Sequence, residues 1–187
     1  MAGPPGFTVW FTGLPCSGKS TLAELVAADL RRRGRFVEVL DGDEIRTHLS
    51  ADLGFSKEDR DKHIRRIGWL CKILSRNGVV AVASFVSPYR EIRDFNRREV
   101  GRFVEVFVDC PVEVCAQRDV KGMYERAMKG EIPNFTGVSD PYEEPLNPEV
   151  VVHTDRETTE ENAAKVIQRI KELGYLSAGA GERPERR

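Results

Sequence analysis

The chain has 187 residues, of which 29 are lysine or arginine and 30 are aspartate or glutamate, so its formal net charge is −1. This balance gives no reason to expect a nucleic acid or an anionic membrane as a partner. No apolar run approaches the ~18 residues of a membrane span, and the N-terminus shows no signal-peptide pattern. The four cysteines form no C-x-x-C pair, so we expect free thiols and a cytoplasmic location.

Strand-like and helix-like segments alternate along the chain. In order, the patterns predict a strand at Phe7–Thr12, a helix over 19–33, a strand over 36–40, a helix over 56–77, a strand over 79–83, a helix over 88–100, a strand at Phe103–Asp109, a short helix over 111–118, a strand at Val150–His153 and a helix over 158–173. Ser56 and Ser87 are expected to cap the helices that follow them, and Thr158 with Glu161 forms a capping box.

This alternation predicts an α/β fold, a parallel sheet of about five strands with helices on both faces. One domain is expected over 7–174, with a flexible N-terminus at 1–6 and a disordered tail at 175–187. The segment 121–148 is punctuated by glycine and proline and only weakly periodic. Loops of this length inside compact domains are usually functional or disordered, so we expect a lid there.

The most informative motif follows the first predicted strand and opens the first helix. It matches G-x-x-x-x-G-K-[ST], the P-loop pattern of nucleotide-binding proteins, and predicts a P-loop NTPase fold. Its backbone would cradle the phosphates of ATP, Lys19 would reach the β- and γ-phosphates, and Ser20 would hold Mg²⁺. The motif and the next residue are Gly13, Leu14, Pro15, Cys16, Ser17, Gly18, Lys19, Ser20 and Thr21.

Charged side chains follow the second predicted strand. Asp41 and Asp43 could order Mg²⁺ through water or accept a proton from an attacking hydroxyl, and Arg46 would lie near an anionic acceptor. A plain turn at 41–43 is the alternative reading. Farther on, Arg60 and His63 share a helix face with Arg66, which is either a solvated surface or a basic wall for an anion.

Other candidates lie in irregular segments. Phe55 and Phe135 could each stack on a base, at about 1–3 kcal/mol per base, or pack the lid against the body. Ser87 is by default only a helix cap. Arg118, just before the lid, is a candidate contact to the nucleotide.

Taken together, these motifs resemble the adenylylsulfate kinase (APS kinase) family over about residues 6–173. The resemblance is carried by an ordered set of runs, which are 13–21, 40–43 with Arg46, 53–60, 64–68, 84–90, 103–109, 118–122 and 134–137. A P-loop alone indicates only a nucleotide. The ordered combination is far more specific.

The resemblance implies phosphorylation of the 3′-hydroxyl of adenosine 5′-phosphosulfate (APS) by ATP, which gives 3′-phosphoadenosine 5′-phosphosulfate (PAPS) and ADP in sulfate assimilation. It implies that Phe55 and Phe135 sandwich the adenine of APS, that Arg46 and Arg60 hold its phosphosulfate, and that His63 also contacts the acceptor. Asp43 would assist at the hydroxyl and Mg²⁺, and Lys121 and Asn134 would close over the acceptor. It also implies a homodimer and a link to an ATP sulfurylase, and it makes Ser87 a candidate phosphoserine, although direct in-line transfer needs only positioning and charge neutralisation.

Two positions depart from the family pattern. Pro15-Cys16-Ser17 stands where a small Ser-Gly-Ala stretch is common, and His63 stands where asparagine is common. The charge of an exposed histidine would vary near pH 6.5, which makes the contact of His63 with the acceptor an open question.

Other functions stay open at this point. A P-loop kinase for a sugar acid or a nucleoside is the nearest alternative, although two phenylalanines and several arginines favour an anionic nucleotide. A GTPase-like switch would need an N-K-x-D run, which the sequence lacks. A catalytically silent regulatory domain would be expected to have lost Lys19, Ser20 or Asp43.

Overall fold

The computed structural model describes residues 4–119 and 121–176. Five parallel strands form one sheet in the order β2-β3-β1-β4-β5. The elements in chain order are β1 (Phe7–Thr12), α1 (Lys19–Arg32), β2 (Val37–Asp41), α2 (Gly42–Leu49), α3 (Lys57–Arg76), β3 (Val80–Ser84), α4 (Arg90–Val100), β4 (Phe103–Asp109), α5 (Val112–Gln117), α6 (Met123–Met128), β5 (Val150–His153) and α7 (Thr159–Glu172). The predicted α/β fold with a parallel sheet is confirmed.

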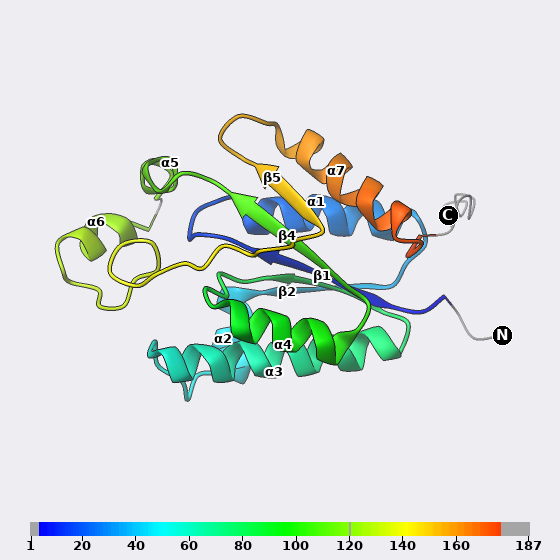
Figure 1. The fold of residues 1–187 in the computed structure, drawn as a ribbon, viewed down its shortest axis with the longest axis horizontal. Helices are drawn as coiled ribbons and strands as arrows, with labels where there is room; N and C mark the ends of the chain where they lie inside the picture. The colour runs from blue at the N-terminus through cyan, green and yellow to red at the C-terminus, as the bar shows by residue number, and fades with distance from the viewer. Residues whose placement is uncertain (1–3, 120, 177–187) are drawn as a thin grey trace, which may run out of the picture.

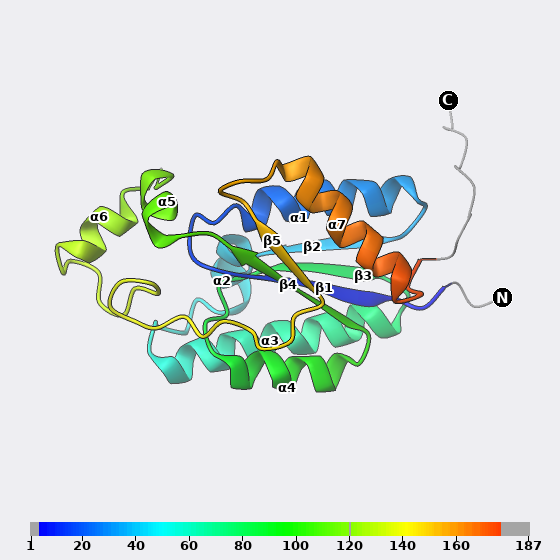
Figure 2. The ribbon, with the colours of Figure 1, turned by 45° about the horizontal axis from the view of Figure 1, so that its top comes forward.

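Helices cover both faces of the sheet, with α1 and α7 on one side and α2, α3 and α4 on the other (Figure 1). Alternate residues of the strands supply the two cores, as a pleated sheet requires. Phe7, Val9 and Phe11 of β1 pack in the cluster under α1 and α7, whereas Trp10 packs in the cluster under α3 and α4. Figure 2 shows the same two helical layers from another angle.

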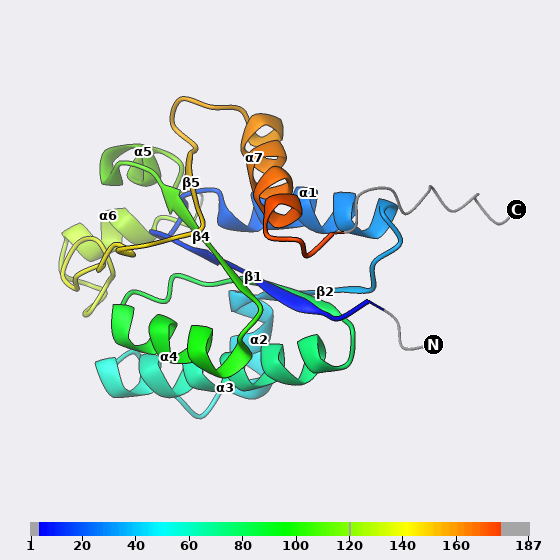
Figure 3. The same cartoon turned by 45° about the vertical axis from the view of Figure 1, so that its right-hand side comes forward.

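The carboxyl ends of the strands point toward the end of the molecule where α5 and α6 lie, whereas the described chain ends lie at the opposite end (Figures 1 and 3). The register places Asp41 of β2 beside Ser84 of β3, and Ser84 beside Phe11 of β1. The starts of three loops therefore meet at one edge. Ligands of parallel α/β sheets gather at this edge.

Several elements differ from the sequence predictions. The valine-rich sequence of β2 favours a buried strand, but β2 is an edge strand, and only Leu40 of its side chains is buried. The helices α2 and α6 were not predicted, because each has only eight or six residues and shows little helical periodicity. α4 begins at Arg90 with Tyr89 at its N-cap, so Ser87 is not a helix cap.

Both ends of the fold extend beyond the limits predicted for the domain. The Gly6 amide donates to the carbonyl of Ser75 at 3.2 Å. The carbonyl of Tyr175 accepts from Arg35 at 3.1 Å, and Leu176 is buried. A single anchoring residue such as Tyr175 leaves no periodic signal in the sequence. The rest of the predicted flexible ends, 1–3 and 177–187, lies outside the described residues. No helix among the described residues has the length and apolar character to cross a membrane.

Candidate active site

The P-loop joins the end of β1 to α1 and turns sharply. Gly18 is the N-cap of α1 and has φ of 91°, in the left-handed region that glycine adopts freely. Cys16 also has a positive φ, of 61°. No side chain caps the start of α1 in the part of the chain that the structure describes. Its backbone N–H groups and the positive end of its dipole are therefore available to an anion.

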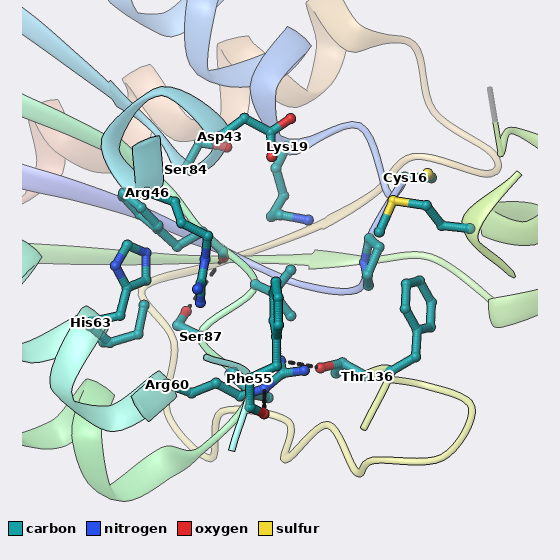
Figure 4. Close-up of a pocket in the computed structure, with 18 of the residues that line it drawn as sticks. Cys16, Lys19, Asp43, Arg46, Phe55, Arg60, His63, Ser84, Ser87 and Thr136 are labelled. Atoms are coloured by element: carbon teal, nitrogen blue, oxygen red, sulfur yellow. Dashed lines mark hydrogen bonds between the residues drawn. The ribbon is translucent and has the colours of Figure 1, made fainter. Parts of the chain in front are cut away.

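Lys19 is almost fully buried beneath this loop (Figure 4). Its Nζ donates to the carbonyl of Leu14 at 2.6 Å and lies 3.4 Å from Ser17 Oγ. Burial lowers the pKa of Lys19 to about 8, because a low-dielectric surrounding disfavours the ammonium. A phosphate at the loop would supply the missing negative charge and favour the charged form.

The predicted magnesium ligands are only partly brought together. Ser20 Oγ donates to Asp41 Oδ2 at 2.9 Å and lies 3.3 Å from Ser84 Oγ. Asp41 also caps α2 by accepting from the amide of Asp43 at 3.0 Å. The carboxylate of Asp43, which is highly exposed, pairs instead with Lys121 at 2.5 Å. The D-G-D run is thus a helix start, not a turn, and Asp43 faces the lid.

One cavity of about 420 Å³ begins at the P-loop and continues between α2, α3 and the lid. Most of the predicted site residues line it. They are Pro15, Cys16, Lys19, Ser20, Asp41, Asp43, Arg46, Phe55, Arg60, His63, Ser87, Lys121, Asn134 and Phe135. The structure therefore joins residues that are spread over more than half of the chain.

Arg46 and Phe55 form one wall of the cavity. The Arg46 guanidinium lies 4.3 Å from the centroid of the Phe55 ring, within the range of a cation–π contact. Its Nη1 donates to the carbonyls of Leu53 and Gly54, at 3.1 Å each. Burial and the neighbouring charge of Arg60 lower the pKa of Arg46. Phe55 is 58% exposed, so its ring is accessible.

The predicted basic wall on α3 is only partly formed. Arg60 faces the cavity, whereas Arg66 lies outside it and forms a two-point ion pair with Asp52 at 2.6 and 2.7 Å. His63 is not on a solvated face. It is 6% exposed, and its Nδ1 lies 2.8 Å from Ser50 Oγ. Burial, followed by the charges of Arg46 and Arg66, lowers the pKa of His63 to about 4, so the ring is neutral at physiological pH.

The opposite wall comes from the lid. Phe135 is 5% exposed, and its ring meets the Tyr124 ring edge-on, with centroids 5.0 Å apart. The Tyr124 hydroxyl donates to the carbonyl of Pro15 in the P-loop at 2.9 Å. Sequence reasoning did not single out Tyr124 as a site residue. A tyrosine in a polar, weakly periodic segment gives little signal, because its partners come from distant segments.

Ser87 lies in the loop between β3 and α4 with φ of 40°. Its Oγ accepts from Trp10 Nε1 at 3.1 Å and lies 3.0 Å from Thr12 Oγ1. Its carbonyl accepts from the buried Arg93, whose Nε contacts Glu105 at 3.0 Å. Ser87 is 2% exposed, and its hydrogen bonds hold the loop against β1. The sequence did not indicate Arg93, because a buried arginine on a helix has the same pattern as an exposed one.

Arg118 lies beside the P-loop and does not line the cavity. Its Nη2 donates to the carbonyl of Thr154 at 2.7 Å, and its Nη1 lies 3.2 Å from Thr154 Oγ1. Thr154 in turn donates to the carbonyl of Ser17 at 2.8 Å. Thr154 was missed by sequence reasoning, although its place after the last strand was an available signal.

Comparisons with known proteins agree with this geometry. The family model described as adenylylsulphate kinase matches residues 5–153. The adenylyl-sulfate kinase of Rippkaea orientalis is 55% identical over 172 residues, which cover 92% of this chain and 95% of that protein. A probable bifunctional SAT/APS kinase 2 of Sorangium cellulosum is 57% identical, but this chain covers only 29% of its length.

Among solved structures, the Mycobacterium tuberculosis APS kinase CysC in complex with AMPPNP and APS superposes with a TM-score of 0.86. It is 41% identical, and the match covers 90% of this chain and 99% of that chain. This chain belongs to the adenylylsulphate kinase family.

Proposed function

We infer that the chain transfers the γ-phosphoryl group of ATP to the 3′-hydroxyl of APS and releases PAPS and ADP, the reaction of its family. The observation that carries the inference is the continuity of one cavity. It extends from Lys19 and Ser20 of the P-loop to Phe55 and Phe135. A kinase must hold donor and acceptor with the reacting atoms in line, and this cavity has a site for each.

We place ATP at the P-loop, as the AMPPNP complex of the M. tuberculosis relative supports. The uncapped start of α1 and Lys19 would bind the β- and γ-phosphates. The other P-loop residues, from Gly13 to Thr21, would surround the phosphate chain. Arg118, fixed beside the loop through Thr154, would contact the nucleoside part of ATP.

We place APS between Phe55 and Phe135, whose rings would stack on its adenine. Arg46 would bind the phosphosulfate, because its Nε and Nη2 have no hydrogen-bond partner among the described residues. Lys121 and Asn134 would close over the acceptor from the lid, 121–148. Closure of such a lid excludes water, which would otherwise receive the phosphoryl group.

Mg²⁺ fits the pair formed by Ser20 and Asp41, since both present oxygen donors and their oxygens lie 2.9 Å apart. A bound Mg²⁺ would neutralise charge on the β- and γ-phosphates. Asp43 would accept the proton of the 3′-hydroxyl once Lys121 turns from Asp43 to the phosphates. This assignment keeps Lys19, Asp43 and Lys121 as the catalytic groups.

We assign Ser87 to positioning. A nucleophilic serine needs a base that accepts its proton, but the Ser87 hydroxyl contacts Thr12 and Trp10, and neither is a base. Direct in-line transfer from ATP to APS therefore explains the site without a phosphoserine.

The test is ADP release with APS, with gluconate and without an acceptor, combined with chromatographic detection of PAPS. We expect ADP and PAPS in equal amounts with APS and only background ADP otherwise. Lys19→Ala should abolish turnover and leave APS binding within about twofold, because Lys19 lies at the donor end. Turnover of gluconate, or ATP hydrolysis that is independent of an acceptor, would refute the assignment.

We also propose the partners and the location that the family suggests. The Sorangium relative, named a bifunctional SAT/APS kinase, supports a link to a sulfurylase that supplies APS. We propose a homodimer in the cytoplasm, and the four free cysteines agree with a reducing compartment. Analytical ultracentrifugation of the purified chain, alone and with a sulfurylase, tests the assembly.

A further inference from the structure

Two phenylalanines face the acceptor part of the cavity from unconnected parts of the chain. Phe55 lies in the loop before α3, and Phe135 lies in the lid. A planar base gains stacking energy from both rings only if the rings are held about two stacking distances apart. Some group must therefore fix the position of the lid relative to α3.

Arg60 is placed to do this. Its Nε donates to the carbonyl of Phe55 at 3.0 Å. Its Nη1 donates to Thr136 Oγ1 at 2.8 Å, and its Nη2 donates to the carbonyl of Asn134. One guanidinium thus contacts the backbone of one phenylalanine and both chain neighbours of the other. Figure 4 shows Arg60 between Phe55 and Thr136.

The contacts of Arg60 on the lid side are suited to fixing the position of the lid. Thr136 is 2% exposed. Asn134 has φ of 55°, a left-handed conformation that asparagine tolerates better than most residues. A guanidinium is planar, so the directions of its N–H groups are fixed relative to one another. The three acceptors are therefore held in a fixed arrangement, which the flexible chain of a lysine could not reproduce.

The two arginines at Phe55 differ in what they contact. Both guanidiniums lie over the Phe55 ring, at 4.3 Å for Arg46 and 5.8 Å for Arg60. Arg46 uses only Nη1, whereas Arg60 uses all three of its nitrogens on uncharged oxygens of the protein. Arg46 is therefore better placed to bind an anion, and Arg60 is better placed to join the two walls.

We propose that Arg60 is a positioning residue that sets the separation of Phe55 and Phe135 and thereby selects acceptors that carry a planar base. The inference rests on the proposed function for the identity of the acceptor. If Arg60 only held the phosphosulfate, its loss would not affect a ligand that has no charge. As a positioning residue, Arg60 affects the binding of such a ligand too.

The experiment measures binding of uncharged adenosine and of APS by equilibrium dialysis, for the full chain and for Arg60→Lys. We expect Arg60→Lys to weaken adenosine binding about tenfold, as expected when one of two stacking contacts is lost, and to weaken APS binding by at least the same factor. Arg76→Lys, at an exposed position in the last turn of the same helix, is the matched control and should change neither.

Thr136→Val tests the lid end of the same contact. It replaces the hydroxyl by a methyl group of similar size, and we expect adenosine binding to weaken about fivefold, the effect of one lost hydrogen bond. This variant decides the question if Arg60→Lys does not fold, as judged by circular dichroism and the melting temperature.

Unchanged adenosine binding together with weakened APS binding would overturn the inference, because Arg60 would then act on the anion alone. Failure of the proposed function gives a different result. In that case the unsubstituted chain forms no PAPS, whereas the effect of Arg60→Lys on adenosine binding can still be measured.

Discussion

His63 provides the sharpest quantitative prediction, because its surroundings depart most from what the sequence suggests. The ring is buried, bonded to Ser50 through Nδ1 and edge-on to Phe85, with centroids 5.6 Å apart. Burial disfavours the charged ring, and protonation would also place a charge near the guanidiniums of Arg46 and Arg66, so the pKa of His63 falls to about 4. The unfolded chain has no such surroundings, so its histidine keeps the ordinary value near 6.5.

The sign follows from proton binding. Between pH 6.5 and 4 the unfolded state binds more protons than the folded state, so stability rises with pH in this window and falls as the solution is acidified. At 1.36 kcal/mol per pKa unit, the fall of the His63 pKa from 6.5 to about 4 removes about 1 kcal/mol of unfolding free energy by pH 5.5 and about 3 kcal/mol by pH 4.5.

The measurement is urea unfolding of the unsubstituted chain and of His63→Asn at pH 7.5, 6.5, 5.5 and 4.5. The difference in unfolding free energy should move in favour of His63→Asn by the amounts above as the pH falls. His48→Asn, at an exposed position, controls for loss of a histidine as such. Parallel curves for the unsubstituted chain and His63→Asn would show that His63 titrates alike in both states and would refute the reasoning.

The same variant also tests the acceptor contact. Because His63 is neutral at physiological pH and its hydrogen-bond partner is Ser50, an asparagine can replace it as a hydrogen-bonding group. We expect His63→Asn to retain most of kcat/KM for APS at pH 7.5. A loss of more than about tenfold, ~1.4 kcal/mol, would mean that the ring itself contacts the acceptor.

Three further changes test other parts of the site. Ser87→Ala should retain turnover within about tenfold. It should also lower the melting temperature, because Trp10 loses its hydrogen-bond acceptor. Abolished turnover in a folded protein would instead indicate an obligatory phosphoserine. Tyr124→Phe should weaken ATP binding about fivefold, since one hydrogen bond to the P-loop is worth about 1 kcal/mol, and unchanged ATP affinity in a calorimetric titration would contradict this. Gly68→Ala should lower the unfolding free energy in urea by about 1–3 kcal/mol, because the added Cβ would lie 2.1 Å from Asn96 Oδ1. Equal stability would show that α3 and α4 separate easily.

Local sequence determined the elements whose signals are local. The strands Phe7–Thr12, Phe103–Asp109 and Val150–His153 lie where predicted. Short runs rich in apolar and β-branched residues favour buried strands of a parallel sheet. The helix after Ser56 and the capping box at Thr158 were also predicted, since a cap is a contact between residues three apart. The P-loop was predicted for the same reason, since the motif is contiguous, and the family was predicted from the order of several such local runs along the chain.

Tertiary structure alone decided which charged and polar groups meet. The pattern of α3 cannot distinguish Arg60, which contacts the lid, from Arg66, which pairs with Asp52 outside the cavity. It also could not reveal that His63 is buried. These outcomes depend on where α2 and the lid pack, and those segments have too few periodic residues to be positioned from sequence.

The candidate site shows the same division. Which residues can bind phosphate or stack on a base follows from their side-chain chemistry, and the sequence determined that. Whether Asp43 faces Mg²⁺ or Lys121, and whether Ser87 caps a helix or supports a loop, depends on contacts between residues 75 or more positions apart. Such contacts form only when the strand order β2-β3-β1-β4 brings the segments that follow these strands to one edge. Segments that are distant in sequence carry no signal of each other until the sheet joins them.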